Sequence, residues 1–377
     1  ALNDRLTGRD GLLKSVTDVS GVPLTIGSQN INKPAKNGDN IALTIDRNIQ
    51  AYAEKALAAG LQRSGATNGS VVVLDPQSGK VMAMANLPTF NPAEFTKVTD
   101  AAAFNNDVVT RPYEPGSDIK TFTMATGLDS GVIEPDSTYN NTDSITVEDR
   151  TISNATKGHT GNITMQVGLN YSLNTSVVTV AERLGDGRTI TLDARKKLFD
   201  YFHNRFAFGR LTGIEVAGEQ AGTIWSPESQ QGNAVRYSNM TFGQGMDLTM
   251  IQVASAFGAL LNGGTYYYPT LINGVVDNSG TLRPATPKEP RRGVISAKTS
   301  EKIHQMIHTA RSTFYAAKDR PGYDVGGKTG TSQTIENGRY VDNQTIGTYL
   351  GYGGDSVPRY VIMVEVSGKG LNLQGNK

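Results

Sequence analysis

Hydrophobic residues cluster in short strand-like runs near both ends of the chain. Residues 70–74 and 80–85 flank Asp75-Pro-Gln-Ser-Gly79, a segment rich in turn-forming residues, so this region predicts a β-hairpin. Residues 345–352 and 359–366 predict two further strands far along the chain. We expect these distant runs to pair within one antiparallel sheet.

The middle of the chain shows helical spacing instead. Its clearest helix covers residues 248–261, where apolar side chains recur every three or four positions before Asn262-Gly-Gly264 ends it. Asp46 follows a short predicted strand and is placed to cap a helix that runs to about residue 61. Similar patterns predict helices at residues 117–128, 164–170, 177–184, 193–206 and 299–314. Strands at the ends with helices between them predict an α+β fold, in which helices cover an antiparallel sheet.

Composition narrows the possible functions. The 377 residues include 36 Lys and Arg against 35 Asp and Glu, so the net charge of +1 gives no reason to expect a nucleic-acid partner. The absence of cysteine excludes disulfides, thiolate metal sites and a cysteine nucleophile. No stretch approaches the roughly 20 apolar residues needed to span a bilayer.

The first motif with chemical content is Tyr113-Glu-Pro-Gly-Ser-Asp-Ile-Lys120. Pro115 and Gly116 interrupt the chain, and Ser117 begins the predicted helix, where free backbone N–H groups favour developing negative charge. Lys120 shares the helix face with Ser117 because it lies three residues further on. To deprotonate a serine, this lysine needs its pKa lowered from about 10.4 to roughly 7 or 8, which burial and a second cation would achieve.

Two later motifs complete the set. In Ser172-Leu-Asn174, the hydroxyl would pass a proton between Lys120 and a leaving amine, and the Asn174 amide would hold Lys120 and accept from a substrate N–H. In Gly-Lys328-Thr329-Gly330-Thr331, the cation would depress the pKa of Lys120 and the threonines would grip a carboxylate. Gly330 would let a peptide lie alongside as an added strand. Each motif alone is weak, but this trio in this order is typical of serine penicillin-recognising enzymes.

Two other patterns point elsewhere and are set aside. Residues 322–329 match the phosphate-binding loop, but a buried strand does not precede them and a helix does not follow. His304 and His308 stand four residues apart on a predicted helix, but Gln305 replaces the glutamate of a zinc protease, so we expect surface histidines. Asp75 and Glu114 are single acids without an evident partner, so a paired-carboxylate mechanism has no support.

Beyond the trio, the chain resembles class B, monofunctional penicillin-binding proteins over nearly its whole length. The segments that resemble the family are Tyr113-Glu-Pro-Gly-Ser117, Gly243-Gln-Gly245, Leu43-Thr-Ile-Asp46 with Gln50, and residues 73–79. The resemblance implies a five-stranded antiparallel sheet with an all-helical lobe. It also implies a transpeptidase domain over residues 39–377. Residues 1–38 would then be a remnant of the N-terminal pedestal and linker, since Leu6-Thr-Gly-Arg-Asp-Gly11 resembles its end.

The resemblance also implies roles for the motif residues. Ser117 would be the acylated nucleophile, Lys120 its base, Ser172 and Asn174 the proton relay and substrate clamp, and Lys328 their electrostatic partner. Thr329 and Thr331 would hold a carboxylate, and the backbone N–H groups of Ser117 and Thr331 would form the oxyanion hole. No metal or organic cofactor is expected.

The implied activity is peptidoglycan D,D-transpeptidation. A serine ester formed from a D-Ala-D-Ala stem peptide would be resolved by a neighbouring amine, and β-lactams would mimic the donor. The expected location is the extracytoplasmic face of the bacterial membrane, with an anchor outside this sequence and a glycosyltransferase partner. Three other interpretations fit the same motifs: a β-lactamase, a β-lactam sensor, and an inactive scaffold in an elongation or division complex.

Asp118 departs from the family pattern, which more often has a small polar residue there. An acid beside the nucleophile would raise the pKa of Lys120 and slow acylation by β-lactams. The alternative is that Asp118 simply occupies the first helical turn, where acids are favoured.

Overall fold

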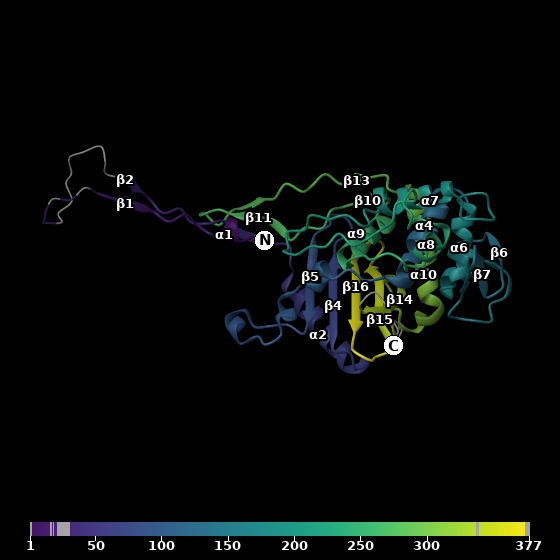
Figure 1. The fold of residues 1–377 in the computed structure, drawn as a ribbon. Coiled ribbons are helices and arrows are strands. Elements are labelled where there is room, and N and C mark those ends of the chain that lie inside the picture. Colours follow the sequence, from purple (N-terminus) through teal and green to yellow (C-terminus); the bar gives the residue numbers. More distant parts are fainter. Residues whose placement is uncertain (1, 16, 18, 21–30, 337–338, 374–377) are drawn as a thin grey trace. The chain divides into compact units, whose positions relative to one another are not determined.

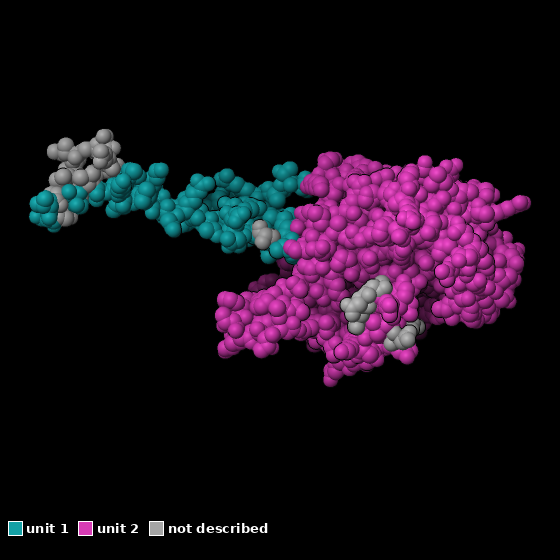
Figure 2. All heavy atoms as spheres, in the orientation of Figure 1, with its two compact units in different colours: residues 1–44, 215–217, 270–287 teal, residues 45–214, 218–269, 288–377 magenta. Residues whose placement is uncertain are grey.

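The computed structural model describes residues 2–15, 17, 19–20, 31–336 and 339–373. Chain contacts divide it into two compact units, coloured separately in Figure 2. The smaller unit comprises residues 1–44, 215–217 and 270–287, and the larger comprises residues 45–214, 218–269 and 288–377. All the predicted catalytic residues belong to the larger unit.

The smaller unit consists of short helical and strand segments. It contains α1 (Asn3–Leu6), the antiparallel pair β1 (Leu12–Lys14) and β2 (Ile31–Lys33), and a three-stranded sheet. That sheet is ordered β12-β11-β3, with β3 at Asn40–Leu43, β11 at Ile272–Val276 and β12 at Leu282–Pro284. Every residue of β1 and β2 is exposed, so this pair contributes nothing to a core.

The larger unit is built on a five-stranded antiparallel sheet ordered β14-β15-β16-β4-β5 (Figure 1). Its strands are β4 (Asn68–Leu74), β5 (Val81–Leu87), β14 (Asp324–Glu336), β15 (Arg339–Gly354) and β16 (Pro358–Ser367). The predicted sheet is confirmed, including the hairpin and the two strands near the C-terminus. β14 lies at one edge and carries residues 328–331, so the third motif is part of an edge strand.

Helices cover both faces of β4, which explains the run of apolar residues at 71–74. On one face, Val71 and Val73 form a hydrophobic cluster with residues of α2 (Arg47–Ser64). α9 (Met250–Leu261) lies against β4 and β16. Asp46 caps α2 as predicted, since its side chain accepts hydrogen bonds from the first backbone N–H groups of that helix, at 2.8 and 3.0 Å.

A second group of helices lies beside the sheet, with α4, α6, α7 and α8 together in Figure 1. The main members are α4 (Lys120–Asp129), α5 (Met165–Asn170), α6 (Asn174–Arg183), α7 (Leu192–Phe199), α8 (Ala234–Met240) and α10 (Ala297–Tyr315). Shorter elements are η1 (Pro92–Lys97), η2 (Ala101–Phe104), α3 (Asp107–Thr110), η3 (Gly116–Ile119) and η5 (Ala316–Lys318). Small strand pairs are β6 (Thr138–Asn141) with β9 (Gly161–Thr164), β7 (Ser144–Val147) with β8 (Arg150–Ser153), and β10 (Thr265–Tyr266) with β13 (Arg291–Arg292). The helix predicted at residues 193–206 continues beyond α7 as a π-helical segment, η4 (Asp200–Arg205).

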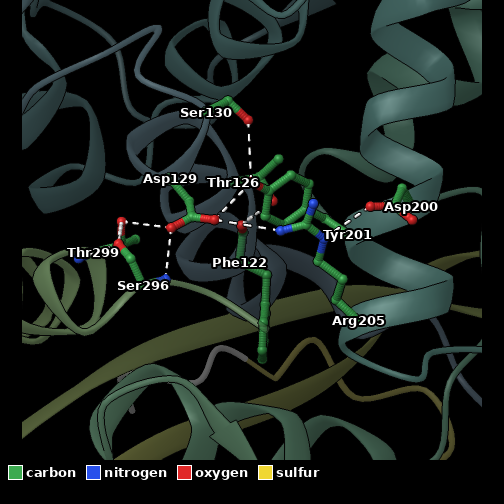
Figure 3. Close-up of polar contacts among 9 residues, drawn as sticks. All are labelled: Phe122, Thr126, Asp129, Ser130, Asp200, Tyr201, Arg205, Ser296 and Thr299. Carbon is green, nitrogen blue, oxygen red and sulfur yellow. Dashed lines mark hydrogen bonds and ion pairs between the residues drawn. The ribbon is translucent and has the colours of Figure 1, made fainter. Parts of the chain in front are cut away.

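Asp129, the last residue of α4, joins three of these helical segments (Figure 3). Its Oδ1 accepts hydrogen bonds from the Ser296 N–H (2.8 Å) and the Thr299 hydroxyl (2.9 Å) at the start of α10. Its Oδ2 accepts from the Tyr201 hydroxyl at 2.7 Å and lies 3.5 Å from Arg205 Nη1. Burial alone would raise the pKa of Asp129, but these hydrogen bonds outweigh burial and hold the pKa below its ordinary value.

We expect Asp129→Ala to lower the free energy of unfolding at pH 7 by about 2–4 kcal/mol, because several charge-assisted hydrogen bonds are lost together. The folded-state pKa is depressed, so the carboxylate stabilises the protein above its unfolded pKa of about 3.9. That contribution disappears as the pH falls through the folded-state pKa. Urea unfolding of both proteins at several pH values measures the difference.

Ser130→Ala is the matched control, because Ser130 makes one long hydrogen bond of 3.5 Å to Tyr201 in the same cluster. Equal losses of stability for Asp129→Ala and Ser130→Ala at pH 7 would contradict the role assigned to the carboxylate.

Candidate active site

The first motif forms a tight turn before its helix. Residues 116–119 are 3-10 helical as η3, and the α-helix begins at Lys120, three residues later than predicted. A 3-10 turn has three residues per turn, so Ser117 and Lys120 project on the same side, as the sequence predicted. Ser117 is half-buried, whereas Lys120 is buried.

Three backbone segments meet beside Ser117. The Gly116 N–H donates to the Gly243 carbonyl at 3.0 Å. A Cβ on Gly116 would lie 2.5 Å from the Thr331 carbonyl oxygen, and a Cβ on Gly243 would lie 2.1 Å from the Gly116 carbonyl oxygen. Both glycines also have positive φ, so no other residue type fits either position without strain. The turn that carries Ser117 is therefore held directly against β14.

The second motif meets the first at Lys120. Lys120 Nζ donates hydrogen bonds to the Ser172 carbonyl at 2.5 Å and to Ser172 Oγ at 3.2 Å. Ser172 lies between α5 and α6 in a left-handed conformation with φ of 56°, which is uncommon for a residue other than glycine. The structure thus brings together two motif residues that are 52 positions apart.

Asn174 has a different partner from the one expected. Its Nδ2 donates to the Ser153 carbonyl at 2.8 Å, so β8 orients this amide, and Lys120 donates to Ser172 instead. The next residue of α6 is also anchored, because the Thr175 N–H donates to Oδ1 of the buried Asn154 at 3.0 Å. Sequence reasoning missed Asn154, and only its position beside α6 reveals its role.

Lys328 of β14 is buried close to Lys120. Burial is the main cause that lowers the pKa of Lys120 far below its ordinary value, and the charge of Lys328 lowers it further. Burial also lowers the pKa of Lys328, to about 8, although the carboxylate of Asp118 opposes this shift. Burial and the charge of Lys328 thus favour the neutral form of Lys120, which is the form that a base requires.

Asp118 lies in the first turn of η3, as the alternative interpretation expected. The residue is fully buried, and its Oδ2 accepts a hydrogen bond from the Thr348 hydroxyl of β15 at 2.7 Å. A Cβ on Gly330 would come within 2.8 Å of the same oxygen, so this glycine makes room for the carboxylate. Burial raises the pKa of Asp118, whereas the Thr348 hydrogen bond and the charge of Lys328 lower it. The charge of Asp118 thus acts on the pKa of Lys328, whereas the shift of the Lys120 pKa has burial and Lys328 as its causes.

Glu114 also has partners that the sequence did not reveal. Its Oε1 accepts a hydrogen bond from the Gly245 N–H at 2.6 Å, and the Tyr340 hydroxyl donates to the same oxygen at 3.1 Å. Glu114 thereby ties the nucleophile turn to the loop that contains Gly243. This role is structural, since the hydrogen-bond partners of Glu114 are a backbone N–H and a tyrosine hydroxyl.

The substrate-binding residues predicted from the third motif follow one another on β14. Because strand side chains alternate, Thr329 and Thr331 lie on one face, opposite the face where Lys328 and Gly330 approach Asp118. β15 pairs with one side of β14, and β14 ends the sheet order on its other side. An edge strand of this kind is a suitable template for an added peptide strand.

The two patterns set aside earlier have structural explanations. β14 runs from Asp324 to Glu336, so the residues that mimic a phosphate-binding loop belong to a strand. His304 and His308 each lie 2.9 Å from one oxygen of Asp324. His304 is only 23% exposed, so the expectation of a surface histidine is wrong for this residue.

Within the part of the chain that the structure describes, no group of three or more histidines and carboxylates is arranged to hold a metal ion. Over the same residues, none of the helices has both the length and the apolar character needed to cross a membrane.

Comparisons with known proteins agree with this geometry. The family model described as "Penicillin binding protein transpeptidase domain" matches residues 69–377. The chain is 30% identical to stage V sporulation protein D of Bacillus subtilis over 97% of its length, and 29% identical to the penicillin-binding protein PbpB of Mycobacterium tuberculosis over 100%. It covers 55% of each of these two relatives, so it spans about half of their length.

Solved structures show the same fold. Penicillin-binding protein 3 of Mycobacterium tuberculosis, in complex with aztreonam, superposes with a TM-score of 0.80 at 27% identity, covering 95% of this chain and 83% of that one. Penicillin-binding protein 2X of Streptococcus thermophilus superposes with a TM-score of 0.80 at 25% identity, covering 97% of this chain and 54% of that one.

Proposed function

Because this chain belongs to the penicillin-binding protein transpeptidase domain family, we propose that it is a serine D,D-transpeptidase that cross-links peptidoglycan stem peptides. The observation that carries the proposal is that buried Lys120 contacts Ser172 and lies near buried Lys328, beside the turn of Ser117. Burial and a neighbouring cation lower the pKa of Lys120, which makes it a base able to activate a serine.

The proposed reaction has two acyl transfers. Lys120 takes the proton of Ser117 Oγ, which attacks the carbonyl between the two D-alanines, and Ser172 delivers a proton to the departing D-alanine amine. An amine from a neighbouring stem peptide then attacks the ester and releases Ser117. Backbone N–H groups of Ser117 and Thr331 would stabilise both oxyanions. Their placement is supported by the close contact of Gly116 with the Thr331 backbone.

Substrate recognition would use the remaining motif residues. Thr329 and Thr331 would hold the terminal carboxylate, Asn174 would contact the peptide, and Gly330 would allow the peptide to run along the free edge of β14. β-Lactams would enter as donor mimics. The name of the relative from Neisseria flavescens, a probable peptidoglycan D,D-transpeptidase, supports this reaction. An extracytoplasmic location, a glycosyltransferase partner and an N-terminal pedestal ending near residue 38 belong to the same proposal.

Intact-mass measurement after incubation with a penicillin tests the proposal. The expected result is a stable adduct of one antibiotic mass, located by peptide mapping on the peptide that contains Ser117. An adduct that hydrolyses within seconds would indicate a β-lactamase. No adduct, or one on another residue, would overturn the proposal and favour an inactive scaffold or a different site.

Asp118→Asn is expected to slow acylation by a penicillin mainly at alkaline pH. The Asp118 carboxylate raises the pKa of Lys328, so its removal should bring that pKa below about 8. The alkaline limb of the pH–rate profile, where Lys328 loses its charge, should therefore shift to lower pH. Stopped-flow acylation rates measured from about two pH units below to about two pH units above the Lys328 pKa of about 8 would reveal the shift.

Asp355→Asn is the control for this prediction, because Asp355 is an exposed acid that pairs with Arg359. An alkaline limb at the same pH in Asp118→Asn and in this control would contradict the assigned role of Asp118.

A further inference from the structure

The first turn of α6 follows the second motif directly, and its support comes from another part of the chain. The start of a helix needs partners for its free backbone N–H groups, and Leu173 at the N-cap position has no polar side chain to supply one. The Thr175 N–H donates instead to Asn154 Oδ1 at 3.0 Å. One residue earlier in both segments, Asn174 Nδ2 donates to the Ser153 carbonyl at 2.8 Å. Ser153 and Asn154 thus hold two consecutive residues at the start of α6.

Asn154 is itself fixed by a buried polar network. Its Nδ2 donates to Asn141 Oδ1 at 3.1 Å and to Asp143 Oδ1 at 3.4 Å. Asn141 Oδ1 also accepts from the Thr175 hydroxyl at 2.9 Å, so Thr175 is bound to both asparagines. The exposed fractions of Asn154 and Asn141 are only 2% and 1%, so bulk water does not compete for these bonds. β6, which ends at Asn141, lies against α6 (Figure 1).

The network permits one orientation of the Asn154 amide. A backbone N–H can only donate, so the atom of Asn154 that faces the Thr175 N–H must be the amide oxygen. Rotation of the amide by half a turn would place Nδ2 against this N–H and Oδ1 against the oxygens of Asn141 and Asp143. Buried polar groups without a partner are costly, so the observed orientation is strongly favoured. Asn154 is therefore a rigid support for α6.

We propose that Asn154 is a positioning residue of the transpeptidase, which holds Asn174 in the orientation that binds the donor peptide. The inference rests on the proposed function and adds a residue that acts on the substrate through Asn174 alone. The hydrogen bond to Ser153 uses one Nδ2–H of Asn174 and leaves its second Nδ2–H and its Oδ1 for a substrate. A peptide group offers a carbonyl and an N–H, so its chemistry matches these two atoms.

The other half of the second motif is supported separately, by α5. The N–H groups of Ser172 and Leu173 donate to carbonyls of α5 at 3.1 and 2.8 Å. These bonds hold Ser172 in its left-handed conformation, in which its carbonyl accepts a hydrogen bond from Lys120. Loss of Asn154 should therefore weaken recognition of the peptide group and leave the proton transfers through Lys120 in place.

Two penicillins separate recognition of the peptide group from the reaction itself. Benzylpenicillin carries an acylamino side chain, which contains a peptide-like group, whereas penicillanic acid has the same ring system without that side chain. The ratio of their acylation rates measures how well the enzyme recognises the group. We expect Asn154→Ala to lower this ratio about tenfold, which corresponds to about 1.4 kcal/mol. An equal fall of both rates, with the ratio of the wild type, would overturn the proposal.

Asn140→Ala is the matched control, because Asn140 is an exposed asparagine of β6 beside Asn141. Its ratio should equal that of the wild type. The double variant Asn154→Ala/Asn174→Ala tests the route of the effect. If Asn154 acts through Asn174, the double variant should have the same ratio as Asn174→Ala alone, because residues that act as one unit are not additive. Losses that multiply would show that Asn154 acts independently, and the assigned role would be wrong.

Thr175→Val is the second variant, which serves if Asn154→Ala does not fold. It removes the hydroxyl bound to Asn141, keeps the size of the side chain, and keeps the backbone N–H bound to Asn154. We expect it to lower the ratio about threefold, because one bond of the network is lost. A ratio equal to that of the wild type would contradict the positioning role. Failure of the wild-type protein to react with benzylpenicillin would instead count against the proposed function.

Discussion

Ser117→Ala is expected to abolish the penicillin adduct, with a loss of roughly 10³- to 10⁶-fold in acylation rate. The substitution removes the hydroxyl that becomes the ester and keeps the backbone that Gly116 and Gly243 position. Alanine is well tolerated at the start of a helix of this kind, so the fold should be retained. Intact mass and a thermal melt of the same sample measure both effects.

Ser172→Ala is the informative comparison, because it keeps Ser117 and removes the hydroxyl 3.2 Å from Lys120 Nζ. It should acylate more slowly than the wild type but still form an adduct. Undiminished adduct in Ser117→Ala would show that another residue is the nucleophile, and the mechanism proposed for this site would be wrong.

Lys120→Met is expected to lower the rate of acylation by about 10²- to 10⁴-fold, the usual contribution of a general base. Lys120 is 1% exposed, and methionine keeps much of its length and apolar stem without a charge to desolvate. In the wild type, acylation should fall on the acid side as Lys120 becomes protonated, because its pKa is held far below the ordinary value. The variant should lack this acid limb.

Stopped-flow measurements over a range of pH give both the acylation rate and the acid limb of its pH–rate profile. Lys298→Met, at an exposed position near the start of α10, is the matched control. If Lys120→Met retained the acid limb at the same pH as this control, some other group would be the base, and the lowered pKa of Lys120 would have no catalytic meaning.

Structural features that depend on residues close together in the sequence could be predicted from the sequence. Turn residues and apolar runs located the hairpin of β4 and β5, and Asp46 marked the start of α2, because caps and turns are satisfied within a few residues. The predicted helix at residues 248–261 differs from α9 by two residues at its start only. The resemblance of the motifs and of several other segments to class B penicillin-binding proteins identified the family, and the family match over residues 69–377 confirms it.

Sequence patterns predicted the helix type less well where tertiary packing determines the backbone conformation. The first motif starts with a 3-10 turn, and the predicted helix at residues 193–206 ends in a π-helical segment. Both departures occur in buried surroundings, where tertiary contacts outweigh the small differences in intrinsic propensity.

The electrostatics of the site were decided by the tertiary structure. Asp118 accepts a hydrogen bond from Thr348, which is 230 residues away in the sequence. Lys120 donates a hydrogen bond to Ser172, which is 52 residues away. The sequence showed which side chains could react, because residue type and motif order are local information. It did not show that Asp118 acts on Lys328 and not on Lys120, since the loss of solvent and the distances between charges arise only when remote segments pack together.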